Sequence, residues 1–276
     1  MKKRQLLITA CIYLGLSSCT AKSLEVDPQI TTPEKPVIVI EDDSIWGKYY
    51  VGDIIFEDKA PSSEGSRIYH ELIPNPKSYI TQQARTVLNT LYHSPKDSIV
   101  PVYRLHYTLE DSDGISAKGG GNGDISIFYS TRHIANSYVD KDAGNVLFET
   151  RGVLLHELTH AYQLEPQGIG SYGTNKVFWA FIEGMADAVR IANGGFHGET
   201  DRPKGGNYMN GYRHAGYFFV WLRDHKDSNF LRKFNHSTLE IVPWSFDAAI
   251  KYALGQQYSI DELWHEYQVN MGDIKE

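Results

Sequence analysis

The sequence predicts an α+β fold in which a small twisted sheet is followed by a helical C-terminal half. Residues 100–109 and 124–130 alternate apolar and polar side chains, as half-buried strands do. From residue 150 onward the apolar residues recur at helical spacing instead, first in residues 150–163 and then in residues 176–193. The change of period places the strands before the helices, and we assign residues 45–276 to a single domain.

The N-terminal residues have the features of a bacterial export signal. Residues 1–4 are basic after the initial methionine, and the apolar run at residues 6–16 is too short for a transmembrane helix. The run ends in Leu16-Ser17-Ser18-Cys19, which resembles a lipoprotein signal, so we predict that residues 1–18 are removed and that Cys19 is lipidated. An ordinary secretory signal is the alternative. In both cases the mature protein lies outside the cytoplasm, and the lipid would anchor it to a bacterial cell membrane, which we expect to be the outer membrane.

Composition limits the partners and cross-links that the chain can have. The two cysteines are Cys11, in the signal, and Cys19, at the lipid, so the mature chain is predicted to have no disulfide. A formal net charge of −7 argues against binding to nucleic acid and against a polybasic membrane-binding face. We therefore expect a monomer that contacts the membrane only through its lipid.

The segment between the lipid and the domain, residues 19–44, is rich in proline, threonine and acidic residues and is predicted to be an extended tether. Within it, residues 37–40 are apolar and β-branched enough to form a strand. Residues 45–56 are predicted to contain the first ordered strand, and residues 60–66 a loop. Residues 76–92 have one apolar side and are predicted to form a helix.

Residues 116–123 are unusually rich in glycine. They lack the lysine and the serine or threonine of a phosphate-binding loop, so we predict a flexible hairpin connection and no nucleotide site. Asp111 and Asp113 come just before this stretch and invite a calcium interpretation. The remaining ligands of a calcium loop are missing, which argues against calcium.

The helix predicted at residues 150–163, which Thr150 is expected to cap, carries the pattern His-Glu-x-x-His. His156 and His160 lie one turn apart on the same side of the helix, at about the spacing that two imidazoles need to bind one zinc ion. Glu157 lies beside them and can reach a water molecule at the metal without being a ligand, as the general base of a zinc peptidase does. The alternative is a buried helix with two hydrogen-bonded histidines.

The helix predicted at residues 176–193 supplies a third ligand. It is strongly apolar, yet it carries Glu183 and Asp187 on one face. Carboxylates in so apolar a helix require a partner, because their desolvation costs several kcal/mol. We predict that Glu183 binds the zinc ion and that Asp187 accepts a hydrogen bond from a zinc-bound histidine, which leaves the fourth zinc position for water. Solvated helix-face acids, or a salt bridge with Arg190, are the alternative.

Other histidines are predicted to lie outside the metal site. The metzincin pattern requires glycine three residues and histidine six residues after the second histidine, and those positions hold Gln163 and Pro166. His106 and His133 are isolated in a strand or loop, where a hydrogen-bonded bystander is more common than a ligand.

The segments His156–Gln163, Phe181–Arg190 and Ser259–Tyr267 resemble the plant and bacterial basic secretory protein family of zinc metallopeptidases, over about residues 66–270. The resemblance implies a zincin-like fold of the gluzincin type, in which HExxH is followed by ExxxD. The word "basic" does not suit this chain, whose net charge is −7. In zincins the strand before the active helix is commonly the sheet edge that pairs with an extended peptide, and here that strand would be residues 124–130.

Residues 210–222 are predicted to open a third helix, which brings a donor for the developing oxyanion to the site. Tyr212 and His214 are the candidates, and the resemblance favours Tyr212. The glycine-rich loop at residues 193–207 is expected to rim the cleft, with His197 as a candidate substrate contact. Further helices are predicted at residues 230–234, 245–254 and 259–271, the last with a capping box at its start.

The sequence therefore predicts a zinc-dependent peptidase that hydrolyses peptide bonds of extracytoplasmic proteins. Its cofactor would be Zn²⁺, its partner a protein or peptide substrate, its general base Glu157 and its oxyanion donor Tyr212. The alternative function is a catalytically inactive, zinc-bearing surface lipoprotein that binds glycoprotein or glycan.

Overall fold

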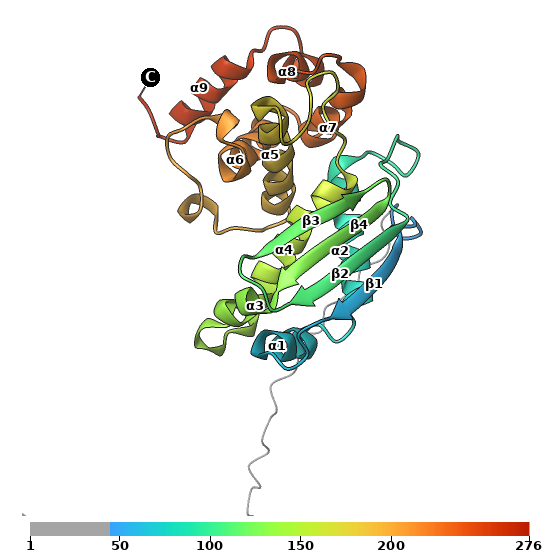
Figure 1. The fold of residues 1–276 in the computed structure, drawn as a ribbon. Coiled ribbons are helices and arrows are strands. Elements are labelled where there is room, and N and C mark those ends of the chain that lie inside the picture. The colour runs from blue at the N-terminus through green and yellow to red at the C-terminus, as the bar shows by residue number, and fades with distance from the viewer. Residues whose placement is uncertain (1–44, 276) are drawn as a thin grey trace, which may run out of the picture. The chain divides into compact units, whose positions relative to one another are not determined.

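The computed structural model describes residues 45–275, which belong to one compact unit (Figure 1). The predictions of an export signal, of a lipid on Cys19, of a tether and of a strand at residues 37–40 all fall outside the described residues. Within residues 45–275, no helix is both long enough and apolar enough to cross a membrane. The predicted α+β fold, with a small sheet first and helices afterwards, is confirmed.

Within residues 45–275, four strands form one sheet in the order β1-β2-β4-β3. The strands β1 (Asp53–Asp58), β2 (Arg104–Glu110) and β4 (Asp124–Ser130) run parallel, and β3 (Ser116–Gly121) is antiparallel to β4. The residues of the turn between β3 and β4, Asn122 and Gly123, have φ angles of 53° and 80°. Asparagine and glycine are the residues that tolerate this left-handed backbone, which is why this turn can be only two residues long.

Two predictions about this hairpin are wrong. The glycine-rich stretch was expected to be a flexible connection, but residues 116–121 form β3, and Gly119, Gly120 and Gly121 all pair with residues of β4. The strand expected at the sheet edge, residues 124–130, lies inside the sheet, because β2 and β3 pair with its two sides. The edge next to the His-Glu-x-x-His helix is therefore β3.

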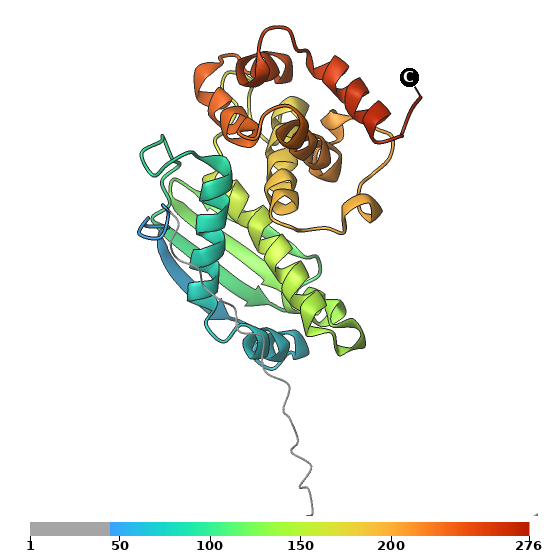
Figure 2. The same cartoon turned by 180° about the vertical axis from the view of Figure 1, so that it is seen from behind.

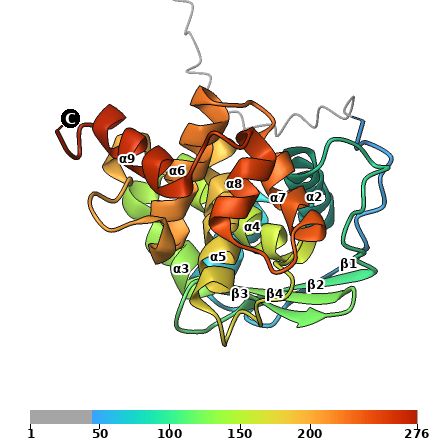
Figure 3. The same ribbon diagram turned by 90° about the horizontal axis from the view of Figure 1, so that it is seen from above.

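The helices α2 (Pro76–Leu91) and α4 (Ala143–Tyr162) lie along one face of the sheet (Figures 2 and 3). Alternate side chains of β2 and β4 point toward these helices and are buried, which produces the predicted alternation. The shorter helices α1 (Glu64–Leu72) and α3 (Thr131–Ser137) pack against each other. The start of α1 was not predicted, because residues 60–66 were assigned to a loop, and Ser63 caps it by accepting a hydrogen bond from the Ser66 N–H.

The start of α4 also differs from the prediction. Asp142 caps the helix by accepting a hydrogen bond from the Gly144 N–H at 2.8 Å, two turns before Thr150. Thr150 is buried in the middle of the helix, and its Oγ1 lies 3.2 Å from the Tyr129 hydroxyl of β4. The capping role predicted for Thr150 is therefore wrong, since this side chain instead forms a buried polar contact with the sheet.

The remaining helices gather at one end of this layer (Figure 1). They are α5 (Lys176–Ala192), α6 (Tyr212–His225), α7 (Phe230–Glu240), α8 (Phe246–Leu254) and α9 (Ile260–Asn270). Three 3-10 turns lie between the longer elements, at Val139–Lys141, Gly198–Thr200 and Tyr208–Asn210.

The helices α5 and α6 pack against each other extensively, and their approach depends on glycine. A Cβ atom at Gly216 would lie 2.8 Å from the Cβ of Asp187, and one at Gly184 would lie 2.5 Å from the Cβ of Ala215. Both distances are shorter than carbon atoms tolerate, so the two glycines let α5 and α6 pack tightly. The packing fixes the part of α5 that carries Glu183 and Asp187.

Candidate metal centre

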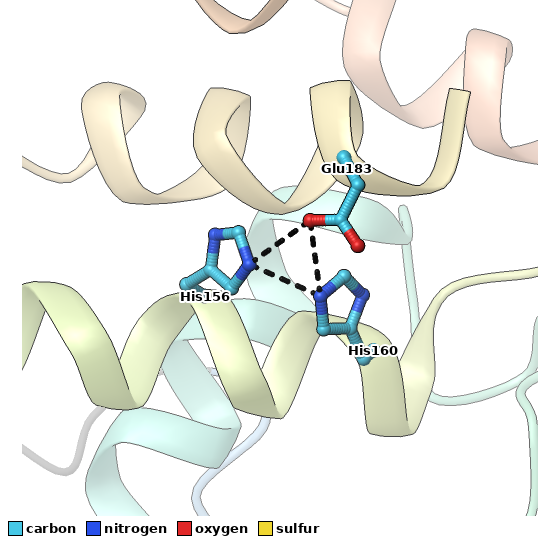
Figure 4. Close-up of side chains that lie close together, drawn as sticks. All are labelled: His156, His160 and Glu183. Atoms are coloured by element: carbon cyan, nitrogen blue, oxygen red, sulfur yellow. Dashed lines mark hydrogen bonds and ion pairs between the residues drawn. The ribbon is translucent and has the colours of Figure 1, made fainter. Parts of the chain in front are cut away.

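Three predicted metal ligands converge between α4 and α5 (Figure 4). His156 and His160 extend from α4, and their Nε2 atoms are 3.1 Å apart. Glu183 reaches from α5 into the same space, and its Oε2 lies 3.4 Å from the Nε2 of His156 and 3.7 Å from the Nε2 of His160. The i, i+4 spacing on each helix explains the convergence, because it keeps each pair of polar side chains on the face that meets the other helix.

The donor set and its spacing fit a zinc ion. Two atoms that bind zinc at about 2.0–2.1 Å with tetrahedral geometry lie about 3.3 Å from each other. The three separations of 3.1, 3.4 and 3.7 Å bracket that value. The Oε2 atom of Glu183 is buried and has no hydrogen-bond partner among the described residues, as expected of an atom that binds a cation.

Each of the three ligands also has a polar partner. The Nδ1 of His156 donates to Asp187 at 2.7 Å, in the arrangement predicted for Asp187. The Nδ1 of His160 lies 2.8 Å from the Gln163 amide, and the Tyr172 hydroxyl donates to the Oε1 of Glu183 at 2.6 Å.

The sequence did not point to Gln163 or Tyr172 as site residues. Gln163 is three residues after His160, so its place on the same helical face was a usable signal. Tyr172 lies in the loop between α4 and α5, where no periodicity fixes the direction of a side chain.

The buried environment changes the acidity of both histidines. Burial acts to lower the pKa of His156, but the nearby carboxylates of Asp187 and Glu183 outweigh it and raise that pKa to about 10. Burial and the neighbouring His156 lower the pKa of His160 to about 3.

Glu157 lies on α4 between the histidines and faces the same cavity as Glu183. Burial raises the pKa of its carboxyl above the ordinary value, and the charge of Glu183 acts in the same direction. The positive charge of His156, and then the neighbouring Ser116 hydroxyl and Lys118 N–H of β3, partly oppose this rise. A carboxyl with a raised pKa next to a metal site can both accept and return a proton.

Tyr212 and His214 occupy different parts of the site. The Tyr212 ring is stacked on the His156 ring, with 6.1 Å between centroids and 11° between planes. Tyr212 has a φ of 41°, a left-handed backbone that is rare for a bulky residue and is found mainly where the surrounding structure imposes it. His214 lies farther along, in the lining of a second cavity.

Two adjoining cavities open at the metal centre, with volumes of about 320 and 720 Å³. Both are lined by Ser116, His156, Glu157 and Tyr212, so the two cavities meet at these four residues. The smaller cavity is bordered by Ser116, Ala117 and Lys118 of the edge strand β3. The larger one is bordered by Phe196 and Pro203, in the loop that was predicted to rim the cleft.

Polar residues that were predicted to lie outside the site have other partners. The Nε2 of His133 lies 3.1 Å from Glu149, and that of His106 lies 3.5 Å from Asp124. Both aspartates of the rejected calcium site, Asp111 and Asp113, accept hydrogen bonds from Arg132. His197, which was expected to be a candidate substrate contact, is stacked on Phe148 with 4.5 Å between ring centroids, and its contact with substrate stays a prediction.

Comparison with known protein families gives a match over most of the chain. A family model described as a peptidase of plants and bacteria, named BSP, matches residues 53–267 of the chain. No curated protein and no solved structure matches. The matched segment contains the sheet, the proposed ligands and both helices that carry them.

Proposed function

This chain belongs to the BSP family of peptidases of plants and bacteria, and from that premise we propose that it is a zinc-dependent peptidase of extracytoplasmic proteins. The observation that carries the proposal is the meeting of His156, His160 and Glu183 at tetrahedral spacing beside the buried carboxyl of Glu157. Two histidines and one glutamate form the donor set of a catalytic zinc site, which retains an open position, rather than the closed set of a structural one.

Zinc held by these side chains would supply a Lewis acid for the substrate carbonyl and lower the pKa of water at the site toward about 7. Glu157 accepts the proton from the attacking water and returns it to the amine that leaves. The burial that raises the pKa of Glu157 suits this double role, because a general base works best when its pKa lies near the operating pH. Asp187 holds the His156 ring in the orientation that directs Nε2 toward the metal.

The developing negative charge on the substrate oxygen needs a hydrogen-bond donor as well as the metal. Tyr212 lines both cavities, and its ring position is fixed by stacking on His156 and by an edge contact with Trp179 at 5.6 Å. We therefore keep Tyr212 as the proposed oxyanion donor.

The shape of the cleft supports internal cleavage of an extended chain. Glu157 lines both cavities, and we propose that one holds the substrate residues before the scissile bond and the other those after it. The strand β3 pairs with β4 on one side only, so its other edge is available to pair with a substrate backbone. We propose an endopeptidase, because an aminopeptidase would need the cleft to end just before the scissile bond.

A Glu157→Gln variant tests the proposal. It keeps the side-chain volume but removes the proton acceptor, so cleavage of a mixed protein substrate should fall by about 10²–10⁴-fold. Zinc content, measured by elemental analysis, should stay at the wild-type level of one ion per chain. Glu71→Gln, at an exposed position on α1, is the matched control and should retain both cleavage and zinc.

Two results would contradict the proposal. One is undiminished cleavage by Glu157→Gln with its zinc in place. The other is wild-type protein that takes up no zinc after reconstitution, because a zinc peptidase cannot then be assembled at this site.

A further inference from the structure

We propose that Gln163 and Tyr172 are positioning residues of the metal centre, each holding one ligand side chain from the side away from the metal. The inference rests on the proposed function, since it presumes a metal ion at His156, His160 and Glu183. It goes further by assigning metal affinity to two residues outside the ligand set, one at the C-terminal end of α4 and one in the loop before α5.

Gln163 is almost completely buried, with 3% of its surface exposed, and its amide contacts the imidazole of His160. The amide nitrogen lies 2.8 Å from the Nδ1 of His160, and the amide oxygen Oε1 is buried with no hydrogen-bond partner among the described residues. A buried amide oxygen without a donor costs about 1–3 kcal/mol, so this atom requires one.

A metal-bound His160 supplies that donor. An imidazole that binds a metal through Nε2 carries its proton on Nδ1, and it usually donates that proton to an oxygen. A half-turn of the Gln163 amide exchanges its nitrogen and oxygen without moving the backbone and places Oε1 at the same 2.8 Å contact. The hydrogen bond from Nδ1–H to Oε1 then satisfies the amide oxygen, moves the amide NH2 to the position that Oε1 held, and leaves the Nε2 of His160 free to bind the metal.

Tyr172 acts on the carboxylate ligand. Its hydroxyl donates to the Oε1 of Glu183 at 2.6 Å, whereas the Oε2 of Glu183 faces the two histidine nitrogens. With Oε1 occupied by the tyrosine, Glu183 presents one oxygen to the metal. The Tyr172 side chain is about half exposed in the wall of the smaller cavity, so this hydrogen bond is its main contribution to the site.

The three ligands are thus each held by one partner: His156 by Asp187, His160 by Gln163 and Glu183 by Tyr172. The partners come from α5, from the end of α4 and from the loop between the helices. A ligand held in its binding orientation before the metal arrives loses less rotational freedom on binding, so removal of a partner lowers metal affinity.

The test is the zinc dissociation constant, measured by competition with a chromophoric chelator on metal-stripped, folded protein. Gln163→Met removes the acceptor at nearly constant volume, and Tyr172→Phe removes only the hydroxyl. Each should raise the zinc dissociation constant by about 10–100-fold, the usual effect of losing such a partner. Gln163→Glu keeps an acceptor oxygen and should bind zinc at least as tightly as the wild type. Tyr103→Phe, at an exposed tyrosine outside both cavity linings, is the control.

The possible outcomes separate this inference from the proposed function. Wild-type protein that binds no zinc would end both. If both Gln163→Met and Tyr172→Phe bound zinc as tightly as the wild type, the inference alone would be overturned. Equal losses of zinc affinity in Gln163→Met and Gln163→Glu would also overturn it, because they would indicate a packing role for Gln163 rather than a hydrogen-bond acceptor. Melting curves of the metal-stripped variants establish that they are folded, and Gln163→Glu and Tyr172→Phe change shape least.

Discussion

Replacement of Asp187 by asparagine removes one negative charge from the metal centre while leaving the shape of the side chain unchanged. Asp187 is buried on α5 and accepts a hydrogen bond of 2.7 Å from the Nδ1 of His156. Asparagine can still accept this hydrogen bond, but from a neutral oxygen. The substitution therefore measures what the charge contributes to holding the ring.

Hydrogen bonds to a charged group contribute about 1.5–3 kcal/mol and neutral ones about 0.5–1.5 kcal/mol. The variant should therefore lose about 1–2 kcal/mol of zinc binding, and at about 1.4 kcal/mol per factor of ten its zinc dissociation constant should rise roughly 5–30-fold. The assay is chelator competition at pH 7.5 with both proteins stripped of metal first. Asp113→Asn is the matched control, because that carboxylate is almost fully exposed and pairs with Arg132 instead.

A zinc dissociation constant for Asp187→Asn within a factor of two of the wild type would refute the reasoning. It would mean that the Asp187–His156 hydrogen bond does not orient a metal ligand. A melting curve of the metal-stripped variant distinguishes weak zinc binding from unfolding, because an unfolded variant would show no melting transition.

Two further predictions concern packing and pH. Gly216→Ala places a Cβ 2.8 Å from that of Asp187, so overpacking should lower the free energy of unfolding by about 1–3 kcal/mol in urea titrations. Gly173→Ala is the control and should change the free energy of unfolding little, because a Cβ there meets nothing within 4 Å. Equal stability of the two variants would contradict the close packing of α5 and α6. The hydrogen bond from the buried Arg202 lowers the pKa of Asp273 in the folded protein. The stability that this pair contributes is therefore fully present above the unfolded-state pKa of about 3.9, and it is lost as the pH falls through the lower folded-state pKa. Asp273→Asn should therefore cost about 2–3 kcal/mol at pH 7 and much less at pH 2–3, and a cost that does not depend on pH would contradict it.

The convergence of the proposed metal ligands could be predicted from the sequence because the geometry within each helix is local. The i, i+4 spacing of His156 and His160, and of Glu183 and Asp187, fixes the face of each helix on which they lie. Only the contact between these two helix faces depends on tertiary structure. The strongly apolar α5 must be buried, and its packing against α4 brings the two faces together.

The edge strand could not be predicted by the same means. Three consecutive glycines in β3 have no side chains that could show an alternating pattern, so the stretch resembled a flexible connection. The usable signal was Asn122-Gly123, which is typical of a two-residue hairpin turn and implies strands immediately on both sides. That turn makes β3 the partner of β4 and moves β4 into the interior of the sheet.

The start of α4 and the role of Tyr172 were missed for different reasons. Thr150 and Asp142 are both acceptable capping residues, and the choice between them is made by the contact of Thr150 with Tyr129 on a distant strand. Tyr172 reaches Glu183 from a loop whose path is set by its own turns, including the hydrogen bonds between Ser171 and Thr174. Neither the Thr150–Tyr129 contact nor the Tyr172–Glu183 contact produces a periodic pattern in the sequence from which it could be predicted.

Anomalous X-ray scattering from crystals of the zinc-loaded protein, collected at the zinc absorption edge, tests the metal assignment most directly. We predict one strong peak per chain, about 2.0–2.2 Å from the Nε2 atoms of His156 and His160 and from one carboxylate oxygen of Glu183. A peak at another set of side chains, or no peak in protein that cleaves its substrate, would contradict the account.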